Sequence, residues 1–504
     1  MTFAKLRNEK VSQSLFILFV VGAALFFFLK TRADPDLWGH LKFGQDIYEK
    51  GEIPKVDTYS YSAYGAPWIN HEWLSELIFY TVYRHTKDTG LVLFKFLSAF
   101  LVTWIVYASA KLWTRSAFLR MLFVVTTLSV LTRGFTIRPQ IFTNLFLACL
   151  IFMIDRLENG LDRKWLIALP VIFLLWPNLH GGFVAGLSIL MLYVLVKLFT
   201  RKLSAPLAVA CAFSVLATLI NPYGIRLWRF MISAVTLDRP FITEWQMSEL
   251  SPQSYGYIIV SMIVLVGLYF AKRRRSAFDL VVLSLAFILA FKHNRHTVLF
   301  AILAAVLMPK YFDSFAGEWF GRMENRLSGF FINSILACYA VFFISGVFSN
   351  TQVNPLKIEI SKDEFPVEAV EFLRANGIKG NIFPWFNWGE MCIRQLGDSN
   401  KVFIDGRYET IYNNPFIHLY FGVVEGQIDY NAALPRFPET DIMFLDVNNR
   451  IVWKVSFDKS WVLAYASPPA VVFLKDNEKN RHVIEKLRKK KLFYPAMTPP
   501  FYFE

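Results

Sequence analysis

The sequence predicts a multi-pass α-helical membrane protein with a C-terminal extracytoplasmic α/β domain. Three observations predict this fold class. The 504 residues are 55% hydrophobic and only 18% charged, which is too apolar for a water-facing protein of this length. Apolar windows long enough to cross a bilayer recur through the first two thirds of the chain and then stop. The remainder alternates short apolar runs with Pro and Asn, as soluble mixed domains do.

The apolar windows predict about eleven membrane spans, because a bilayer core of about 30 Å needs roughly 20 mostly apolar residues per helix. No small-residue cleavage pattern follows the first window, so we expect it to be retained as an anchor and not removed as a signal peptide. The predicted spans cover residues 13–30, 88–110, 116–132, 139–154, 165–177, 181–199, 205–220, 255–271, 277–291, 295–309 and 328–348.

Basic residues in the short loops set the expected orientation. Lys and Arg stay on the cytoplasmic side of a membrane, and here they concentrate in the N-terminal segment and in alternate loops. The N-terminus is therefore expected inside and the C-terminal segment outside. The net charge of +14 has the same origin, because the excess of Lys and Arg lies in the cytoplasmic loops. Nucleic-acid binding is not needed to explain it.

The sequence divides into two expected domains. Residues 1–350 form a transmembrane domain with a large first outer loop at 31–87, and residues 351–504 form an extracytoplasmic soluble α/β domain with its own core. Within this second domain, the spacing of apolar residues predicts one helix and two buried strands, over residues 366–376, 402–404 and 442–445.

Carboxylates directly follow the first span. Asp34 and Asp36 lie at the membrane boundary, where a charge is costly, and this favours a functional role. The same loop contains two stretches, 37–48 and 73–83, that mix aromatic and charged residues as helices at the headgroup boundary do. The further polar candidates in this loop are His40, His71 and Glu72.

Cationic side chains gather at the outer ends of later spans. The segment 292–296 (KHNRH) places several potential cations on a side where short loops are otherwise poor in positive charge, which favours an anionic ligand. For a single arginine, the alternative is that it reaches toward lipid headgroups. The predicted anion contacts are Arg138, His180, His293, Arg295 and His296, and we expect them to line one outward-facing cavity with the carboxylates.

Acids and cations at the outer face suit one class of reaction. The chain has no GxxxxGK[ST] loop or dinucleotide fingerprint, which argues against a nucleotide-driven reaction. A polyprenyl-phosphate-linked sugar instead carries its activation within the membrane. Arg and His would stabilise its phosphate leaving group, and a carboxylate would accept the proton of the attacking hydroxyl.

Two strings in the first outer loop carry a resemblance to a known family. Residues 33–41 (ADPDLWGHL) and 67–74 (PWINHEWL), together with the spans and the outer C-terminal domain, resemble the GT-C superfamily of polyprenyl-linked glycosyltransferases. The likeness covers the whole chain, and the strings resemble a group of bacterial members. It implies a GT-C-like fold, a lipid-linked sugar donor and a catalytic carboxylate in the first loop. Asp34 takes that role by resemblance, and Asp36 is the next candidate.

A second likeness is to the catalytic subunits of oligosaccharyltransferases. Residues 385–390 (WFNWGE) and 403–407 (FIDGR) occupy the place of a Trp-rich motif of that group, with Asn387 and Trp388 where its motif has Asp and Tyr. Trp385 and Trp388 are thus candidates for acceptor contact, and the alternative for both is core packing. That group also uses an acidic motif in its second outer loop for a metal, whereas residues 131–140 hold no acid.

We therefore predict transfer without a metal cofactor. The alternative is Mg²⁺ or Mn²⁺ held by oxygen-rich groups of the first loop, since such ligands suit these ions. The candidates for this alternative are Asp34, Asp36, His40 and Glu72.

The leading hypothesis is a membrane glycosyltransferase. It would move a sugar from a polyprenyl-phosphate donor to a lipid, glycan or protein acceptor at the outer face of a bacterial plasma membrane, with a first-loop Asp as general base. One alternative is a transporter or flippase for a lipid-linked anion, although neither inverted repeats nor broken helices are evident. The other is an oligosaccharyltransferase or glycan ligase that moves a whole glycan.

Overall fold

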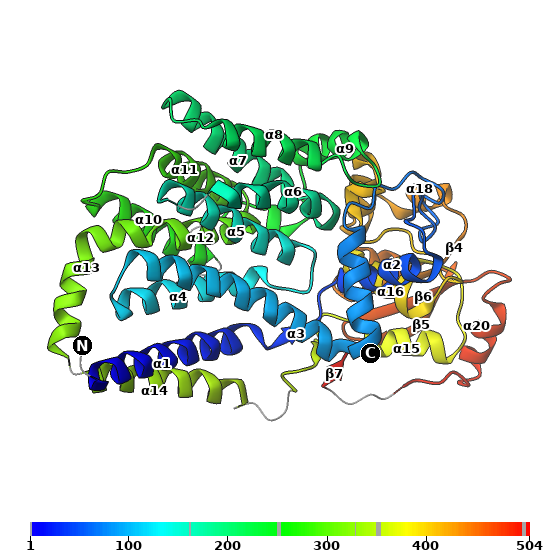
Figure 1. Ribbon diagram of the computed structural model, residues 1–504. Helices are drawn as coiled ribbons and strands as arrows, with labels where there is room; N and C mark the ends of the chain where they lie inside the picture. The colour runs from blue at the N-terminus through cyan, green and yellow to red at the C-terminus, as the bar shows by residue number, and fades with distance from the viewer. Residues whose placement is uncertain are drawn as a thin grey trace. The chain divides into compact units, whose positions relative to one another are not determined.

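The computed structural model describes residues 3–160, 163–248, 254–327, 329–348, 354–495 and 500–503. The chain divides into two compact units, each made of two separate segments. Unit 1 comprises Met1–Thr31 and Thr89–Leu356, and unit 2 comprises Arg32–Asp88 and Lys357–Glu504. Figure 1 shows the elements of both units along the chain.

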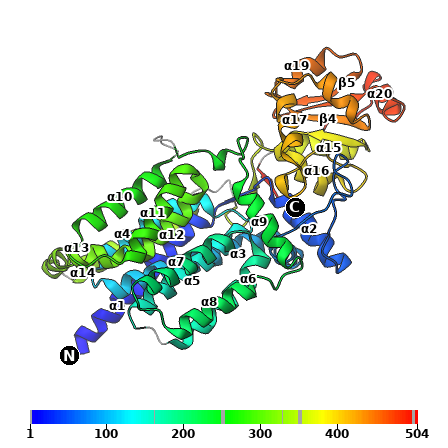
Figure 2. The same ribbon diagram turned by 90° about the horizontal axis from the view of Figure 1, so that it is seen from above.

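Unit 1 is helical, and each predicted span overlaps one of its helices. Figures 1 and 2 show its long helices lying side by side. The helices are α1 (Phe3–Phe28), the second part of α3 (Trp73–Trp113), α4 (Ala117–Leu131), α5 (Gln140–Glu158), α6 (Ala168–Leu179), α7 (Phe183–Phe199), α8 (Ala205–Ala217), α9 (Ile225–Thr236), α10 (Tyr255–Phe270), α11 (Ala277–Lys292), α12 (Thr297–Leu307), α13 (Pro309–Arg326) and α14 (Gly329–Phe348).

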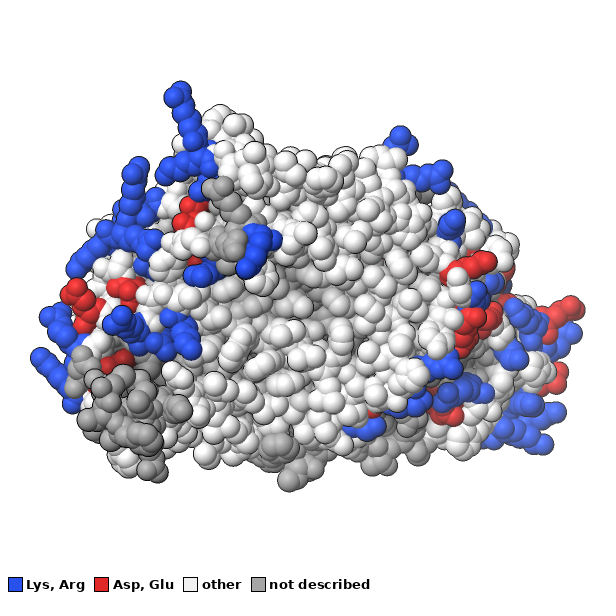
Figure 3. Space-filling model, in the orientation of Figure 1, with Lys and Arg blue, Asp and Glu red and all other residues white. Residues whose placement is uncertain are grey.

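Helix length and composition support membrane crossing. Among the described residues, four helices are long and apolar enough to span a bilayer, or five if the bent pair α12 and α13 forms one span. Several others are apolar but shorter, such as α4, α7 and α10. In Figure 3, Lys and Arg gather at the end of unit 1 where α10 and α13 lie, beside a wide face without charged residues. The count of eleven spans stays a prediction.

The segment α3 agrees with its sequence-based prediction of two helices. We expected an interfacial helix over residues 73–83 and a separate span from 88. The structure contains two helices within Trp73–Trp113, which meet at a break with non-helical angles at Lys87 (φ 57°, ψ −154°). The interfacial position of the first helix stays a prediction. The division between the units falls next to Lys87, after Asp88.

Unit 2 is built around a four-stranded sheet with the order β3-β4-β6-β5. Strand β4 pairs in parallel with β3 and antiparallel with β6, and β5 pairs antiparallel with β6. A smaller sheet has the order β1-β2-β7. The strands are β1 (Thr31–Arg32), β2 (Ile358–Ile360), β3 (Asn381–Pro384), β4 (Thr440–Asp446), β5 (Trp461–Ser467), β6 (Ala470–Lys475) and β7 (Phe501–Tyr502).

Helices and short turns complete unit 2. Helix α2 comes from the first-loop segment and packs against α16 of the C-terminal segment. The helices are α2 (Leu37–Lys50), the first part of α3, α15 (Val367–Ala375), α16 (Gly389–Leu396), α17 (Asn414–Val424), α18 (Tyr430–Ala433), α19 (Ile451–Ser456) and α20 (Arg481–Arg488).

Local predictions in the C-terminal segment have mixed outcomes. The expected helix over 366–376 is α15, and Gly377 has the positive φ of 63° that ends a helix. The expected strand over 442–445 lies within β4. The strand expected over 402–404 is wrong: Val402 forms only isolated bridges, with Ser60 and Ile382. The chain then enters the turn that carries Asp405.

The domain division also differs from the sequence-based expectation. The first outer loop was grouped with the membrane helices, but Arg32–Asp88 folds with Lys357–Glu504. Backbone hydrogen bonds explain this grouping. The N–H of Tyr61 donates to the Val402 carbonyl over 3.0 Å, and the N–H of Val402 donates to the Tyr59 carbonyl over 3.1 Å.

A buried lysine neutralises two carboxylates between helices of unit 1. The Lys310 Nζ lies 2.8 Å from Asp155 Oδ1 and 2.7 Å from Asp279 Oδ2, and the three side chains are buried. Trp113 Nε1 donates to Asp155 Oδ2, and the Tyr311 hydroxyl donates to Asp279 Oδ2. Because an isolated charge is costly in this environment, each member depends on the others.

We expect Lys310→Met to lower the free energy of unfolding by about 3–5 kcal/mol, because two buried carboxylates would lose their cation. The measurement is the thermal midpoint of the purified protein in detergent. Lys202→Met, at an exposed lysine, is the matched control and should leave the midpoint unchanged. Equal midpoints for the two variants would contradict the structural role of this triad.

Candidate functional site

Four sequence motifs meet within unit 2. Asp34-Pro35-Asp36 precedes α2, and Asn70-His71-Glu72 precedes α3. Gly389-Glu390 begins α16, and Asp405-Gly406-Arg407 occupies the turn after Val402. Motifs that are more than 300 residues apart in the sequence thereby contribute to one acidic region, because α2 and α16 pack together.

Asp34 fixes the start of α2. Its Oδ1 accepts the N–H of Asp36 over 3.1 Å, and its backbone carbonyl accepts the N–H of Leu37 over 3.0 Å. Such a side-chain turn is a common way for Asp to begin a helix. The side chain of Asp34 is buried, so the turn is protected from water.

Asp36 and Glu390 share the first turn of α2. Asp36 is the N-cap residue of this helix, yet its side chain makes no capping hydrogen bond. Glu390 Oε2 instead accepts the N–H of Gly39, over 3.1 Å. The cap of α2 is therefore supplied by a side chain from the C-terminal segment.

Two glycines let these carboxyl groups approach the backbone. A Cβ placed on Gly39 would lie 2.1 Å from Glu390 Oε2. A Cβ on Gly406 would lie 2.8 Å from Asp36 Oδ1 and 2.8 Å from Glu390 Oε1. Both carboxyl groups therefore contact the same small residue, and any side chain at position 406 would displace one of them.

The electrostatic environment of Glu390 favours its neutral form beside Asp36. Burial, reinforced by the nearby negative charges of Asp36 and Asp405, raises the pKa of Glu390 well above its ordinary value, while Arg407 acts in the opposite direction. These effects shift Glu390 toward its protonated, neutral form. A neutral Glu390 adds no second negative charge beside Asp36.

His40 forms an ion pair deeper along α2. Its Nδ1 lies 3.5 Å from Glu76 Oε1, and Asn70 donates its side-chain N–H to the other Glu76 oxygen. Burial alone would lower the pKa of His40, but Glu76, with Glu72 and Asp36, raises it above its ordinary value. The His71 Nε2 lies 3.7 Å from Glu72 Oε1.

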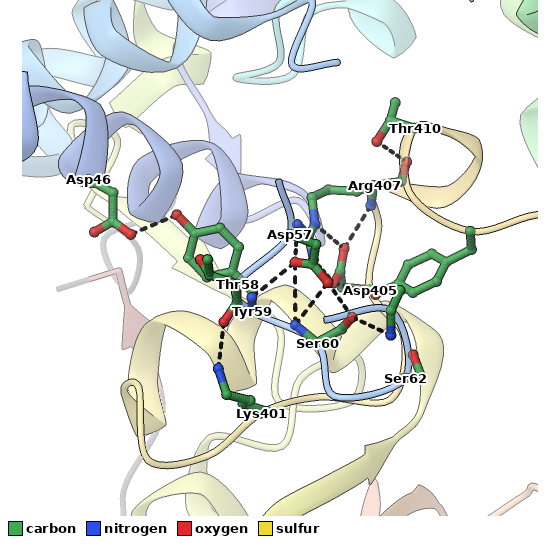
Figure 4. A network of polar contacts seen from close by, with 12 residues as sticks. Asp46, Asp57, Thr58, Tyr59, Ser60, Ser62, Lys401, Asp405, Arg407 and Thr410 are labelled. Carbon is green, nitrogen blue, oxygen red and sulfur yellow. Dashed lines mark hydrogen bonds and ion pairs between the residues drawn. The ribbon is translucent and has the colours of Figure 1, made fainter. Parts of the chain in front are cut away.

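Arg407 holds the turn that contains Gly406, and Figure 4 shows Arg407 beside Asp405 and Asp57. Its Nε and Nη2 donate to the two oxygens of Asp405 over 2.8 and 2.7 Å, and its Nη1 donates to Asp57 over 2.7 Å. The guanidinium also lies 4.9 Å from the ring centroid of Trp68. All three charged side chains are buried, so the turn has little freedom to move.

In unit 1, Glu244 brings two predicted anion contacts together. Arg138 Nη1 lies 3.6 Å from Glu244 Oε1, and Arg295 Nη1 lies 3.5 Å from the same oxygen. Two guanidinium groups thus converge on one carboxylate oxygen. A phosphate oxygen presents a similar target to such a pair.

Trp245 lies among several basic side chains of this region. The guanidinium groups of Arg239 and Arg295 lie 4.1 and 4.5 Å from its ring centroid. The rings of His293 and His296 approach it at 5.2 and 6.0 Å. The His293 Nδ1–H donates to the Trp245 carbonyl over 2.7 Å. We call Arg138, Arg239, Glu244, Trp245, His293, Arg295 and His296 the cationic cluster.

His180 is positioned by the first turn of α5, which follows Arg138 by two residues. Its Nδ1 accepts the N–H of Gly182 over 3.0 Å and lies 2.8 Å from Thr143 Oγ1. Thr143 in turn accepts the Trp176 Nε1–H over 2.8 Å. The Nδ1 of His180 is therefore an acceptor, and a neutral ring carries its proton on Nε2.

The fold of the chain resembles two solved structures. One is an archaeal oligosaccharyltransferase, AglB from Archaeoglobus fulgidus, in complex with an inhibitory peptide and a dolichol-phosphate. Its TM-score is 0.57 at 11% identity, over 95% of this chain and 75% of that one. The other is ArnT from Cupriavidus metallidurans bound to undecaprenyl phosphate. Its TM-score is 0.53 at 12% identity, over 92% of this chain and 98% of that one.

The chain has the GT-C fold. The likeness extends over nearly the whole chain, so the fold implied by the first-loop strings is confirmed. Comparison with protein-family models finds no match, and comparison with curated proteins finds none either. The GT-C fold by itself leaves the substrate open.

The structure places the predicted residues of unit 2 in different surroundings. Asp34, Asp36, His40, His71 and Glu72 lie at or near the starts of α2 and α3. Trp388 is a core residue, since it is buried, stacks near Phe444 and donates to the Glu364 carbonyl. Trp385 is half-buried, and its role in acceptor contact stays a prediction.

Sequence reasoning missed three contributors to the acidic region: Glu76, Glu390 and Gly406. Glu390 and Gly406 stood within motifs that had been noticed, but their neighbours were not apparent from local sequence. Among the described residues, no three His, Cys, Asp or Glu side chains are arranged to hold a metal ion. Metal independence stays a prediction.

The raised pKa of His40 predicts a pH-dependent contribution to stability. The charged imidazole stabilises the fold fully below the unfolded pKa of about 6.5, and this stabilisation is lost as pH rises through the folded pKa. The difference in thermal midpoint between the parent and His40→Gln should therefore be largest in acid and shrink at alkaline pH. Thermal unfolding in detergent across this range measures it.

Glu76→Gln provides the matched background, because it removes the ion-pair partner of His40. In that background, His40→Gln should show a weaker dependence on pH. A difference that stays constant or grows with rising pH in the parent would contradict the ion pair.

Proposed function

We propose that this protein is a membrane glycosyltransferase that moves a sugar from a polyprenyl-phosphate donor to an acceptor hydroxyl on the extracytoplasmic side of a bacterial plasma membrane. The observation that carries the proposal is the buried acidic region on a GT-C fold, in which Asp36 and Glu390 share Gly406. The proposal includes a cytoplasmic N-terminus and about eleven spans, as the loop charges indicate.

The acidic region would supply the general base. In the reaction, the acceptor oxygen bonds to the anomeric carbon as the bond between that carbon and the phosphate oxygen breaks. The acceptor proton passes to a carboxylate, and polyprenyl phosphate departs with the bonding electrons. Resemblance implies Asp34 as the base. The backbone hydrogen bond to Asp34 Oδ1, and the absence of a capping bond on Asp36, support Asp36 as the proton acceptor.

The cationic cluster would bind the phosphate of the donor. Arg138 and Arg295 already converge on the Glu244 carboxylate, which we interpret as standing where a phosphate oxygen binds. His293 and His296 lie beside Trp245, and His180 would add a donor from the end of α6. The solved AglB and ArnT structures contain dolichol-phosphate and undecaprenyl phosphate, which supports a lipid-phosphate ligand.

The transfer of a whole glycan to protein has less support. Trp388, which occupies the place of a recognition residue in the oligosaccharyltransferase motif, is buried in the core. We therefore propose a lipid or glycan acceptor near His40, His71 and Glu72. The assay below must distinguish this transfer reaction from transport of a lipid-linked anion.

We expect Asp36→Asn to lower turnover about 100-fold or more, because the amide cannot accept the proton. Asp34→Asn keeps an oxygen for the turn that starts α2, so its loss should be smaller. The assay incubates purified protein with a panel of radiolabelled polyprenyl-phosphate sugars and envelope lipids, and measures released polyprenyl phosphate. Thermal midpoints confirm that both variants are folded.

The two variants separate the alternatives. Loss confined to Asp34→Asn would assign the base to Asp34 and contradict the assignment to Asp36. Parental turnover in both variants would exclude both aspartates as the base. If the parent binds the donors but releases no polyprenyl phosphate from any of them, the protein is a transporter and the glycosyltransferase proposal fails.

The cationic cluster gives a prediction for donor binding. Glu244→Gln should tighten binding of undecaprenyl phosphate about threefold, because it removes the carboxylate that competes for the two arginines. Arg295→Gln should weaken binding about tenfold. The measurement is a titration of purified protein with undecaprenyl phosphate, and Arg226→Gln, at an exposed arginine of α9, is the control. Weaker binding in Glu244→Gln would contradict the proposed phosphate position.

A further inference from the structure

We propose that Glu390 is a positioning residue for Asp36: it takes over the N-cap of α2 and thereby keeps the Asp36 carboxylate directed to the reaction. This inference rests on the proposed function. It gives a side chain of the C-terminal segment a role in positioning a carboxylate of the first outer loop.

The N-terminal cap of α2 is unusual. An Asp at the N-cap position normally accepts the N–H of the second or third helical residue. Asp36 occupies that position and makes no such bond. Gly39 is the third helical residue, and its N–H donates to Glu390 Oε2 over 3.1 Å. The bond expected of Asp36 is thus made by Glu390.

The two backbone positions that the Glu390 carboxyl group approaches, Gly39 and Gly406, carry no side chain. Any Cβ on Gly39 would overlap the Glu390 carboxyl group, with 2.1 Å to Oε2. Any Cβ on Gly406 would press on both Asp36 and Glu390. The backbone thus leaves room for these two carboxyl groups together, and this room is specific to glycine.

The backbone that carries Glu390 is held in place by its neighbours. Gly389 precedes Glu390, and a Cβ there would lie 2.4 Å from the Ile404 carbonyl oxygen, so α16 begins in direct contact with the turn after Val402. Arg407 locks the same turn through Asp405 and Asp57. Glu390 is therefore delivered to Gly39 by a fixed backbone and not by a flexible loop.

Electrostatics agree with this geometry. The titratable and charged groups that face Glu390 are Asp36, Glu76, Asp405 and Arg407. Burial and the carboxylates raise the pKa of Glu390, which shifts the capping group toward its neutral form and weakens its repulsion of a negative Asp36. A charged cap at the same place would act against the Asp36 carboxylate.

Loss of the Glu390 carboxyl group has a specific consequence for Asp36. The Gly39 N–H would lack its acceptor, and an unsatisfied buried N–H is costly. The nearest replacement by position is Asp36, the residue at the N-cap. Its carboxylate would then accept the Gly39 N–H and be less able to accept a proton from substrate.

The test compares Glu390→Ala, Glu390→Gln and Glu390→Asp for kcat, for KM of the polyprenyl-phosphate donor and for thermal midpoint. Glu390→Gln keeps an oxygen of the same reach and should retain kcat within about threefold. Glu390→Ala and Glu390→Asp lack that reach and should lose kcat about 100-fold, with KM little changed. Glu485→Ala, at an exposed glutamate of α20, is the control.

A double variant tests whether Glu390 acts through Asp36. If it does, Asp36→Asn combined with Glu390→Ala should be no slower than Asp36→Asn alone. A clearly slower double variant would overturn the inference, as would parental activity in Glu390→Ala. If Glu390→Ala does not fold, the Gln and Asp variants decide: active Gln with impaired Asp supports the cap, and the reverse order contradicts it.

These outcomes separate the inference from the proposed function. Inactive Asp36→Asn with fully active Glu390→Ala removes the positioning role and leaves the glycosyltransferase intact. Inactive Asp34→Asn with fully active Asp36→Asn also removes it, since Asp36 would have no task to support. A parent protein that turns over no lipid-linked donor removes the proposed function itself.

Discussion

The buried charge triad of Arg407, Asp405 and Asp57 is the interaction on which the acidic region depends. It joins the first-loop segment to the C-terminal segment of unit 2, since Asp57 belongs to the former and Arg407 to the latter. Removing one partner from such a buried network costs about 3–5 kcal/mol, because an uncompensated charge remains. The position of Gly406, and with it the place where Asp36 and Glu390 meet, follows from this network.

Charged side chains are paired with opposite charges elsewhere in the molecule as well. His40 has Glu76, Lys310 has two aspartates, and the arginines of the cationic cluster have Glu244. The groups differ in exposure. Lys310 and its partners are buried, whereas Glu244 is partly exposed, so its ion pairs are the ones that an incoming anion is best able to replace.

The sequence was sufficient to predict the helices and the type of fold, because apolar windows and loop charges depend on local composition. Residues 37–48, 366–376 and 442–445 formed the elements that their spacing indicated. The roles of Glu390 and Gly406 were not accessible in this way. Their significance lies in contacts with residues more than 350 positions away, and a single sequence contains no record of such proximity. Val402 was mistaken for a strand residue because its apolar run resembles one, whereas the chain turns there to reach Asp405.

The two-segment composition of unit 2 has a consequence for biogenesis. Arg32–Asp88 emerges from the ribosome well before Lys357–Glu504, with all of Thr89–Leu356 between them. At ordinary rates of synthesis the delay is on the order of tens of seconds. Throughout that interval Asp57 lacks its ion pair with Arg407 and α2 lacks its contact with α16, so the nascent first loop is a folding intermediate with exposed apolar surface. Maturation of the protein therefore ends with the closure of this long-range pairing, and a chain that stops short of Arg407 would leave its N-terminal carboxylates unassembled.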